Sequence, residues 1–139
     1  MHGEFSEAQV VTCDVADASA EVNENDALVL VGDRTVRVAD QDGENWHGLA
    51  QGPAKSKPGG GEYVAVELKG ARNGRVAAQY DENEDGSADT DTTAPTTLVP
   101  NGNDGELRPT RSGESGAEGL DGVLMAAPGS DGHGLVLIR

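Results

Sequence analysis

The apolar and polar positions of this 139-residue chain alternate over short runs and show no convincing helical period. A period of two is typical of β-strands, because successive side chains point to opposite faces of a sheet. The clearest run covers residues 63–68, where Glu67 is expected on the polar face. Runs rich in β-branched and other apolar residues predict further strands at 8–15, 28–31 and 35–38.

Glycine-containing turns separate these runs. Gly32 and Asp33 divide two of the predicted strands, and the Asn73-Gly74 pair, a strong hairpin signal, predicts one more strand at 75–80. The chain contains 20 glycines, which argue against long helices. The sequence therefore predicts an all-β fold, a small barrel or sandwich of short strands.

The same order of apolar runs, turns and glycine loops occurs twice along the chain. Gly122 follows Gly48 by 74 positions, whereas Leu135 follows Val64 by 71, so the intervening loop is expected to be three residues shorter in the second copy. Insertions and deletions concentrate in the loops of true structural repeats. We therefore predict an internal repeat.

These patterns divide the chain into four parts. We expect an N-terminal arm and strand at 1–26, a first β-unit at 27–80, an acidic insert at 81–97 and a second β-unit at 98–139. The two units either form two small half-domains with a shared core or fold into one barrel. Aromatic residues make up only 3% of the chain, so its core is thin and favours oligomerisation or a partner surface.

The net charge argues against nucleic acid as a partner and is typical of proteins from high salt. Ten basic and 25 acidic residues give a net charge of −15, and the acids are dispersed along the whole chain. Nucleic acid is an improbable partner, because phosphate binding requires a basic face. Many carboxylates, few lysines and small aliphatic residues are typical of proteins from high salt, where the Debye length falls to about 3 Å. An ordinary acidic surface is the alternative.

Targeting and redox signals are sparse. The first residues form neither the basic nor the apolar part of a secretory signal, and no run approaches the ~18 apolar residues of a membrane span. Cys13 is the single cysteine, so an intramolecular disulfide is impossible, and we expect its side chain to be a small buried hydrophobe.

The acidic insert carries the sharpest chemical motif. Oxygen-bearing residues recur at alternate positions, and Gly86 occupies the sixth position, where a calcium loop bends sharply. Thr92 stands at the twelfth position in place of a bidentate glutamate, so the match is partial. A solvated acidic loop is the alternative to a structural Ca²⁺ or Mg²⁺ site. The candidate ligands are Asp81, Asn83, Asp85, Ser87 and Asp89.

Catalytic interpretations are weaker. His2, His47 and His133 are far apart in the sequence, and carboxylates are too numerous for any pair to indicate acid–base chemistry. The glycine-rich segment 57–61 lacks the Lys-Ser/Thr ending of a phosphate loop and is interpreted as a hairpin loop. No catalytic residues are predicted, and we expect a protein that is not an enzyme and that requires no cofactor.

A few residues are candidate partner contacts. Lys55 and Lys57 are two of only three lysines and lie close together on an acidic chain, although such a pair can also arise by chance. Phe5, in the N-terminal arm, is the third candidate. Trp46, the only tryptophan, is expected in the core rather than at an interface.

Four short motifs of the first β-unit, at 25–29, 36–40, 47–50 and 61–70, occur together within about 12–70. In these motifs the unit resembles the small head-decoration proteins of tailed viruses. It implies a β-rich cement protein on the outside of an icosahedral head, a homotrimer whose partner is the major capsid protein and whose N-terminal arm orders against the shell. The acidic insert at 81–91 departs from the family pattern.

Together with the composition, the resemblance predicts a virion protein of a tailed virus of a halophilic archaeon, located on the capsid exterior. It would stabilise the capsid by bridging its subunits, with no nucleic-acid or membrane partner. The alternative is a calcium-stabilised β-module for adhesion or carbohydrate binding on a tail fibre or cell surface. The scarcity of aromatic residues counts against the carbohydrate-binding form.

Overall fold

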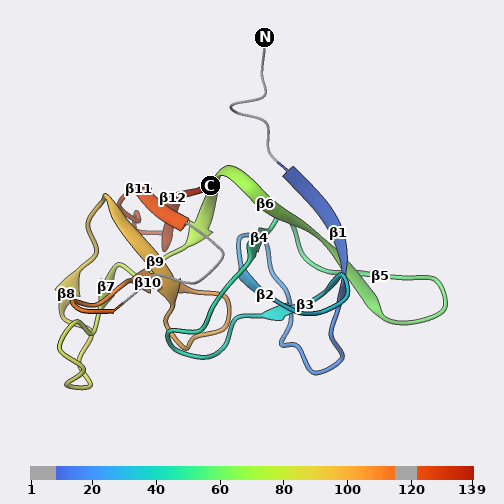
Figure 1. Ribbon diagram of the computed structural model, residues 1–139, viewed down its shortest axis with the longest axis horizontal. Helices are drawn as coiled ribbons and strands as arrows, with labels where there is room; N and C mark the ends of the chain where they lie inside the picture. The colour runs from blue at the N-terminus through green and yellow to red at the C-terminus, as the bar shows by residue number, and fades with distance from the viewer. Residues whose placement is uncertain (1–8, 115–121) are drawn as a thin grey trace, which may run out of the picture.

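The computed structural model describes residues 9–114 and 122–139, and these residues form twelve strands and no helix (Figure 1). The all-β prediction is confirmed, while the expected arm before residue 9 lies outside the described part. The strands are β1 (Gln9–Val15), β2 (Ala27–Gly32), β3 (Thr35–Val38), β4 (Gly48–Ala50), β5 (Lys55–Ser56), β6 (Glu62–Arg75), β7 (Gln79–Tyr80), β8 (Thr90–Asp91), β9 (Thr96–Pro100), β10 (Leu107–Pro109), β11 (Gly122–Ala126) and β12 (His133–Ile138).

Five strands close a first barrel. β1 pairs in parallel with β3 and antiparallel with β6, and the ring is completed by antiparallel pairs β3–β2, β2–β4 and β4–β6. The short β5 forms a hairpin with the beginning of β6, which projects from this barrel (Figure 1). The hairpin loop predicted at 57–61 is confirmed by this pairing.

The strand pairings of the first barrel recur in the second half of the chain. The last part of β6 pairs with β12, and the order continues through β11 and β9 to β10. Val76, the residue directly after β6, forms an isolated parallel bridge with Leu107 of β10. This bridge connects the last strand of the second ring with the end of its first strand, β6. β6 is thus the last strand of the first barrel and the first strand of the second, and it crosses between them in Figure 1.

Residue pairs in the two rings correspond to one another. Ala50 pairs with Val66 in the first barrel, and Leu124 pairs with Val136 in the second. Val136 therefore corresponds to Val66 at an offset of 70, so the expected offset of 71 is wrong by one residue, and the loop is four residues shorter. Leu135 and its neighbours are apolar on both faces of the strand, so alternation could not fix the register.

The hairpin expected at Asn73 and Gly74 is also absent, because both residues lie inside β6 and pair with β12. Neither residue has the positive φ that this kind of hairpin turn requires. Gly74 instead permits close packing, since a Cβ built there would lie 3.0 Å from Val136 Cγ2. The strand expected at 75–80 is reduced to the end of β6, one bridge and β7.

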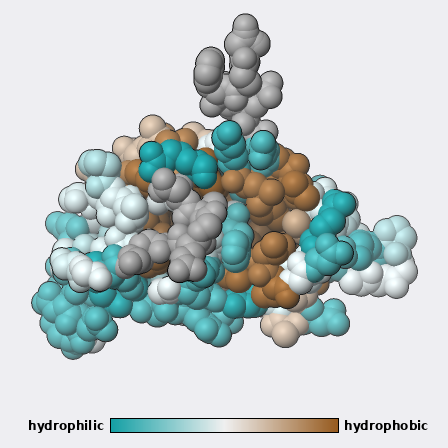
Figure 2. Space-filling view, viewed as in Figure 1, coloured by the Kyte–Doolittle hydropathy of each residue, from teal (hydrophilic) through white to brown (hydrophobic). Residues whose placement is uncertain are grey.

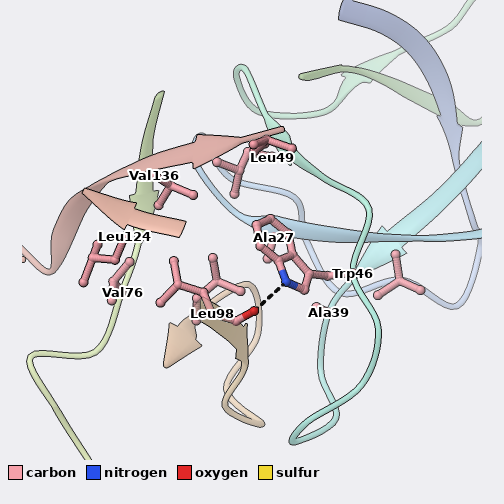
Figure 3. Close-up of a cluster of buried hydrophobic side chains, with 11 residues drawn as sticks. Ala27, Ala39, Trp46, Leu49, Val76, Leu98, Leu124 and Val136 are labelled. Carbon is pink, nitrogen blue, oxygen red and sulfur yellow. Dashed lines mark hydrogen bonds between the residues drawn. The ribbon is translucent and has the colours of Figure 1, made fainter. Parts of the chain in front are cut away.

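The buried residues form two clusters. The first fills the first barrel and consists of Cys13, Val22, Leu28, Val36, Val38, Ala50, Val64 and Val66. The second joins residues from both barrels, so it fills the second barrel and the contact between the two barrels (Figure 3). Its members are Ala27, Val29, Ala39, Trp46, Leu49, Val76, Leu98, Leu107, Leu124, Val136 and Ile138. The expectation of a buried Cys13 is confirmed.

Trp46 is the centre of the second cluster and is fully buried, as expected. Its indole extends from the segment before β4 toward β9, and its Nε1–H donates a 3.0 Å hydrogen bond to the Leu98 carbonyl (Figure 3). The ring lies so close to Gly122 that a Cβ there would come within 2.3 Å of Cζ2. A side chain that precedes β4 of the first barrel thus packs against β9 and β11 of the second.

Replacing this indole tests how strongly the two barrels depend on it. We expect Trp46→Ala to lower the free energy of unfolding by roughly 3–5 kcal/mol, because it opens a large cavity and leaves the Leu98 carbonyl without its donor. Chemical denaturation in molar salt, followed by circular dichroism, measures the change. The exposed Val31→Ala is the control, with an expected change below about 0.5 kcal/mol. Equal stability of the two variants would contradict the role given to Trp46.

Candidate functional site

The first barrel contains an open, apolar cavity of about 340 Å³ at one end. Strands β1, β2, β3, β4 and β6 all contribute to its wall, and charged or imidazole groups occur only at Asp33, Arg34 and His47. The apolar lining residues are Val11, Cys13, Leu28, Leu30, Val36, Val66 and Leu68. We call this feature the first-barrel cavity.

Two hydrogen bonds hold the edge of this cavity in shape. The Leu30 amide donates to His47 Nδ1 at 2.9 Å, and Arg34 Nη2 donates to the Thr12 carbonyl at 3.0 Å. Burial raises the pKa of the Cys13 thiol, with Arg34 opposing and Asp14 adding to the shift. Cys13 is therefore a largely protonated, weakly reactive thiol at neutral pH.

Large apolar side chains remain exposed around the same end. Val10, Leu30 and Val31 are exposed by 43%, 48% and 47%, although most residues of this size in the described chain are buried. On the second barrel, Met125 and Leu135 are also exposed, by 50% and 36%. Figure 2 shows apolar surface gathered near the start of β1, whereas the far lower corner of the molecule is hydrophilic. We call Val10, Leu30 and Val31 the apolar rim. An exposed apolar patch on a soluble chain commonly marks an interaction site.

The predicted contact residues lie apart from the apolar rim. Lys55 and Lys57 are on the projecting β5–β6 hairpin, and Lys57 Nζ forms a 2.9 Å ion pair with Asp14. This pair is exposed, so it contributes little to stability. Phe5 lies outside the described residues. No pattern in the sequence indicated the rim itself, because Leu30 and Val31 belong to an apolar run that resembles a buried strand.

The acidic loop lies between β7 and β8, and its side chains satisfy backbone groups within the loop. The Asp81 carboxylate accepts hydrogen bonds from the amides of Asp85 (3.0 Å) and Gly86 (2.8 Å), and Asp85 accepts one from Ser87. Desolvation opposes ionisation of Asp81, but these hydrogen bonds and Arg111 lower its pKa. Asn83 and Asp89 are exposed.

The described residues include no group of three or more His, Cys, Asp or Glu side chains placed to hold a metal ion. Thr92, the twelfth loop position, donates its hydroxyl to the Ala77 carbonyl at 2.6 Å and does not face the loop. The predicted Ca²⁺ or Mg²⁺ site therefore stays a prediction.

Thermal melting tests whether this loop holds an ion. A structural ion bound only by the folded state would raise the melting temperature in calcium above that in chelator, by an amount that grows with calcium concentration. Asp89→Asn should remove this increment, whereas Asp131→Asn, an acidic residue outside the loop, should not. Identical melting of the wild type in calcium and in chelator would contradict a structural ion.

Arginine side chains bind the two barrels together at the surface of the contact region. Arg108 of β10 is buried and forms two-atom hydrogen bonds with Asp42, in the loop after β3, at 2.9 and 3.3 Å, and with Glu114 at 2.8 and 2.9 Å. Arg111 adds a 3.1 Å contact to Asp42. Sequence reasoning missed this cluster, because its partners are up to 69 positions apart.

Two further arginines of β6 satisfy buried carboxylates. Arg75 forms a 3.0 Å ion pair with the buried Asp26, and Arg72 lies 3.5 Å from Glu67. Glu67 was expected on a polar face, but it is only 3% exposed, because Arg72 and Gln51 cover its carboxylate and Gln51 donates a hydrogen bond to it. The arginines thus act on the protein's own acids.

Acidification tests the Arg108 cluster. Hydrogen bonds from Arg108 lower the pKa of Glu114, although desolvation opposes this shift. At Asp42 desolvation raises the pKa, but the contacts with Arg108 and Arg111 outweigh it, so the pKa of Asp42 is also lowered. A carboxyl whose pKa is depressed by folding stabilises the protein above its unfolded pKa of about 4, and this contribution is lost as the pH falls through the folded pKa.

We expect Arg108→Met to lower the free energy of unfolding by roughly 1–3 kcal/mol at pH 7. Between pH 5 and pH 3 the free energy of unfolding of the variant should then fall less than that of the wild type. Urea denaturation at a series of pH values measures both quantities. Arg34→Met, which removes an exposed arginine, is the control and should keep the wild-type pH dependence. The role assigned to the cluster would be wrong if Arg108→Met and the wild type lost stability in parallel.

No protein-family model matches the chain, and no curated protein is significantly similar to it. Across 9–114 and 122–139, no helix is long and apolar enough to cross a membrane. The fold and the cavity define an acidic all-β protein in which a closed five-stranded barrel shares β6 with a second ring of strands of similar pairing.

Proposed function

We propose that this chain is a structural virion protein that binds the outside of an icosahedral capsid and stabilises it. The observation that carries the proposal is the apolar rim beside the first-barrel cavity. Val10, Leu30 and Val31 keep large apolar side chains in water, which costs free energy unless a partner covers them. The partner we propose is the major capsid protein of a tailed virus of a halophilic archaeon.

The internal construction of the molecule supports a mechanical role. Three features connect the barrels: the shared strand β6, the buried Trp46 indole and the Arg108 ion pairs. A mechanical load applied to one barrel is therefore transmitted to the other. A protein that binds only the assembled lattice favours that lattice by mass action. Bound copies would therefore raise the free-energy cost of shell rupture, without catalysis and without a required cofactor.

The charge distribution supports a location on the outside of a particle in concentrated salt. The net charge of −15 keeps the free protein soluble, and molar salt screens repulsion among its carboxylates. Docking through an apolar rim does not weaken under these conditions, because the hydrophobic effect does not depend on charge. We also propose that the protein acts as a homotrimer, as the resemblance to decoration proteins implies.

The adhesion alternative draws less support from the structure. Carbohydrate-binding surfaces use exposed aromatic rings, but Trp46 is fully buried, and Tyr63 and Tyr80 are partly buried. No described aromatic residue therefore forms an open platform.

Cosedimentation tests the capsid proposal. The protein is mixed in molar salt with heads of tailed haloarchaeal viruses from which the outer proteins have been stripped, and the pelleted fraction is measured against protein concentration. We expect saturable binding at a fixed ratio to capsid subunits, with heads that survive higher temperature. Val31→Asp should weaken binding by at least about tenfold, because it places a charge in an apolar contact.

The matched control is Leu135→Asp, an exposed apolar position on the second barrel. It should bind as the wild type does, and Trp46 fluorescence should be unchanged in both variants. Free protein in the supernatant with every type of head, or equal loss of binding in both variants, would contradict the proposed rim contact.

A further inference from the structure

The side chain of His47 holds one strand at the edge of the first-barrel cavity. The backbone pairing of β2 with β4 ends at Leu28, whose carbonyl accepts a 2.8 Å hydrogen bond from the His47 amide. Two residues further along β2, the Leu30 amide donates to His47 Nδ1 at 2.9 Å instead of to a backbone carbonyl. An imidazole nitrogen thus extends the pairing of this edge of β2 by one bond. We call this bond the His47 contact.

The His47 contact exists in only one protonation state of the ring. Nδ1 accepts the Leu30 proton through its lone pair, so the proton of the neutral imidazole must be on Nε2. A protonated ring carries a hydrogen on Nδ1 as well, and two donors would then face each other. Histidine is the side chain that ordinarily changes its charge between about pH 5 and 8. Acid therefore removes this bond, whereas a bond between two backbone groups would be unaffected.

Few other charged groups surround the ring. The turn between β2 and β3 brings Asp33 and Arg34, one carboxylate and one guanidinium, to the cavity wall that His47 also lines. Among the other described residues of this wall, the one titratable group is the Cys13 thiol of β1, and the side chains from β2 and β6 are apolar. On the segment of the ring itself, Glu44 is paired with Arg37. The two charges in the wall are of opposite sign, so the main effect of the ring proton is the loss of the hydrogen bond.

Loss of the His47 contact frees one edge of β2 at the apolar rim. β4 pairs with β2 at Ala27 and Leu28, so the His47 contact is the one described bond between the two segments beyond Leu28. On its other edge, the end of β2 remains paired with β3. The end of the β2–β3 hairpin can therefore move away from His47 without losing its own pairing. Such a movement changes the cavity directly, because Leu30 and His47 both line it.

We propose that protonation of His47 widens the entrance of the first-barrel cavity. In neutral solution the ring holds the end of β2 beside the segment before β4. In acid the bond to Leu30 is lost, the end of β2 moves away, and the cavity and the apolar rim become more accessible. Because the open form binds one proton more than the closed form, a fall in pH favours it. This inference is independent of the capsid proposal, since it concerns the free protein.

Nuclear magnetic resonance observes the hydrogen bond in the wild type. In ¹⁵N-labelled protein, scalar coupling across an N–H···N hydrogen bond connects the Leu30 amide nitrogen with His47 Nδ1. We expect this coupling at pH 7.5 and its loss at pH 5, with a fall of at least about tenfold in the exchange protection of the Leu30 amide. The Val38 amide, which donates to the Ser19 hydroxyl at 3.0 Å, is the control and should keep its protection. A coupling that persists at pH 5, or a proton on Nδ1 at pH 7.5, would overturn the proposal.

Cys13 reports access to the cavity, because it is the sole cysteine and lines the wall. Its rate of reaction with a small disulfide reagent is measured in the wild type and in His47→Asn. The asparagine oxygen can accept the Leu30 hydrogen bond but is not protonated at these pH values. The ratio of the two rates cancels the effect of pH on the thiol itself. We expect the ratio of wild type to variant to rise by at least about tenfold from pH 7.5 to pH 5.

His133→Asn is the matched control, since His133 lies on β12 of the second barrel. It should react as the wild type does at both pH values, and Trp46 fluorescence verifies that each protein remains folded. A ratio of wild type to His47→Asn that is equal at both pH values would overturn the proposal, because the cavity would then not respond to the imidazole. Loss of the acid response in His133→Asn would also overturn it, because the proton would then act at the other barrel.

Discussion

The arrangement of the two barrels depends on the burial of one indole. Trp46 precedes β4 of the first barrel, and its ring packs in a cluster with residues of both barrels. Its Nε1–H donates a hydrogen bond to the carbonyl of Leu98 in the second barrel. Gly122 must be glycine for the ring to fit, because a Cβ would overlap it. In a chain with 3% aromatic residues, Trp46 is the largest fully buried side chain, and it belongs to the cluster that joins residues of both barrels.

The shared strand β6 and the arginine contacts follow from the same constraint. Because β6 is common to both rings, the barrels cannot separate without breaking strand pairing. Ion pairs of arginines with carboxylates lie at the edge of the contact between the barrels. Arg108 and Arg75 each place a guanidinium against acids that would otherwise repel one another. An acidic chain with seven arginines uses at least five of them, Arg37, Arg72, Arg75, Arg108 and Arg111, in contacts with its own carboxylates. Buried or partly buried pairs are screened less by salt than exposed ones.

Much of the fold could be predicted from local pattern. The strand at 35–38 and the buried Trp46 follow from alternation and composition, and the repeat follows from the order of turns. The pattern failed where a local signal had a tertiary cause. Gly74 gives a hairpin signal but serves close packing inside β6. The Arg108 cluster left no trace in the sequence, because ion pairs between distant segments have no spacing rule. The exposed Leu30 and Val31 could not be distinguished from core residues by hydrophobicity alone.

An apolar rim on an acidic protein is suited to attachment through that rim. The rim belongs to β1 and β2 of the first barrel, and the hairpin β7–β8, which carries the acidic loop, lies on the other barrel (Figure 1). Cryo-electron microscopy of haloarchaeal virus heads incubated with the protein would test the proposed attachment most directly. Density for two fused barrels, with the end of the first barrel against the shell, is the predicted result. Density that contacts the shell through the second barrel, or bare heads at saturating protein, would contradict it.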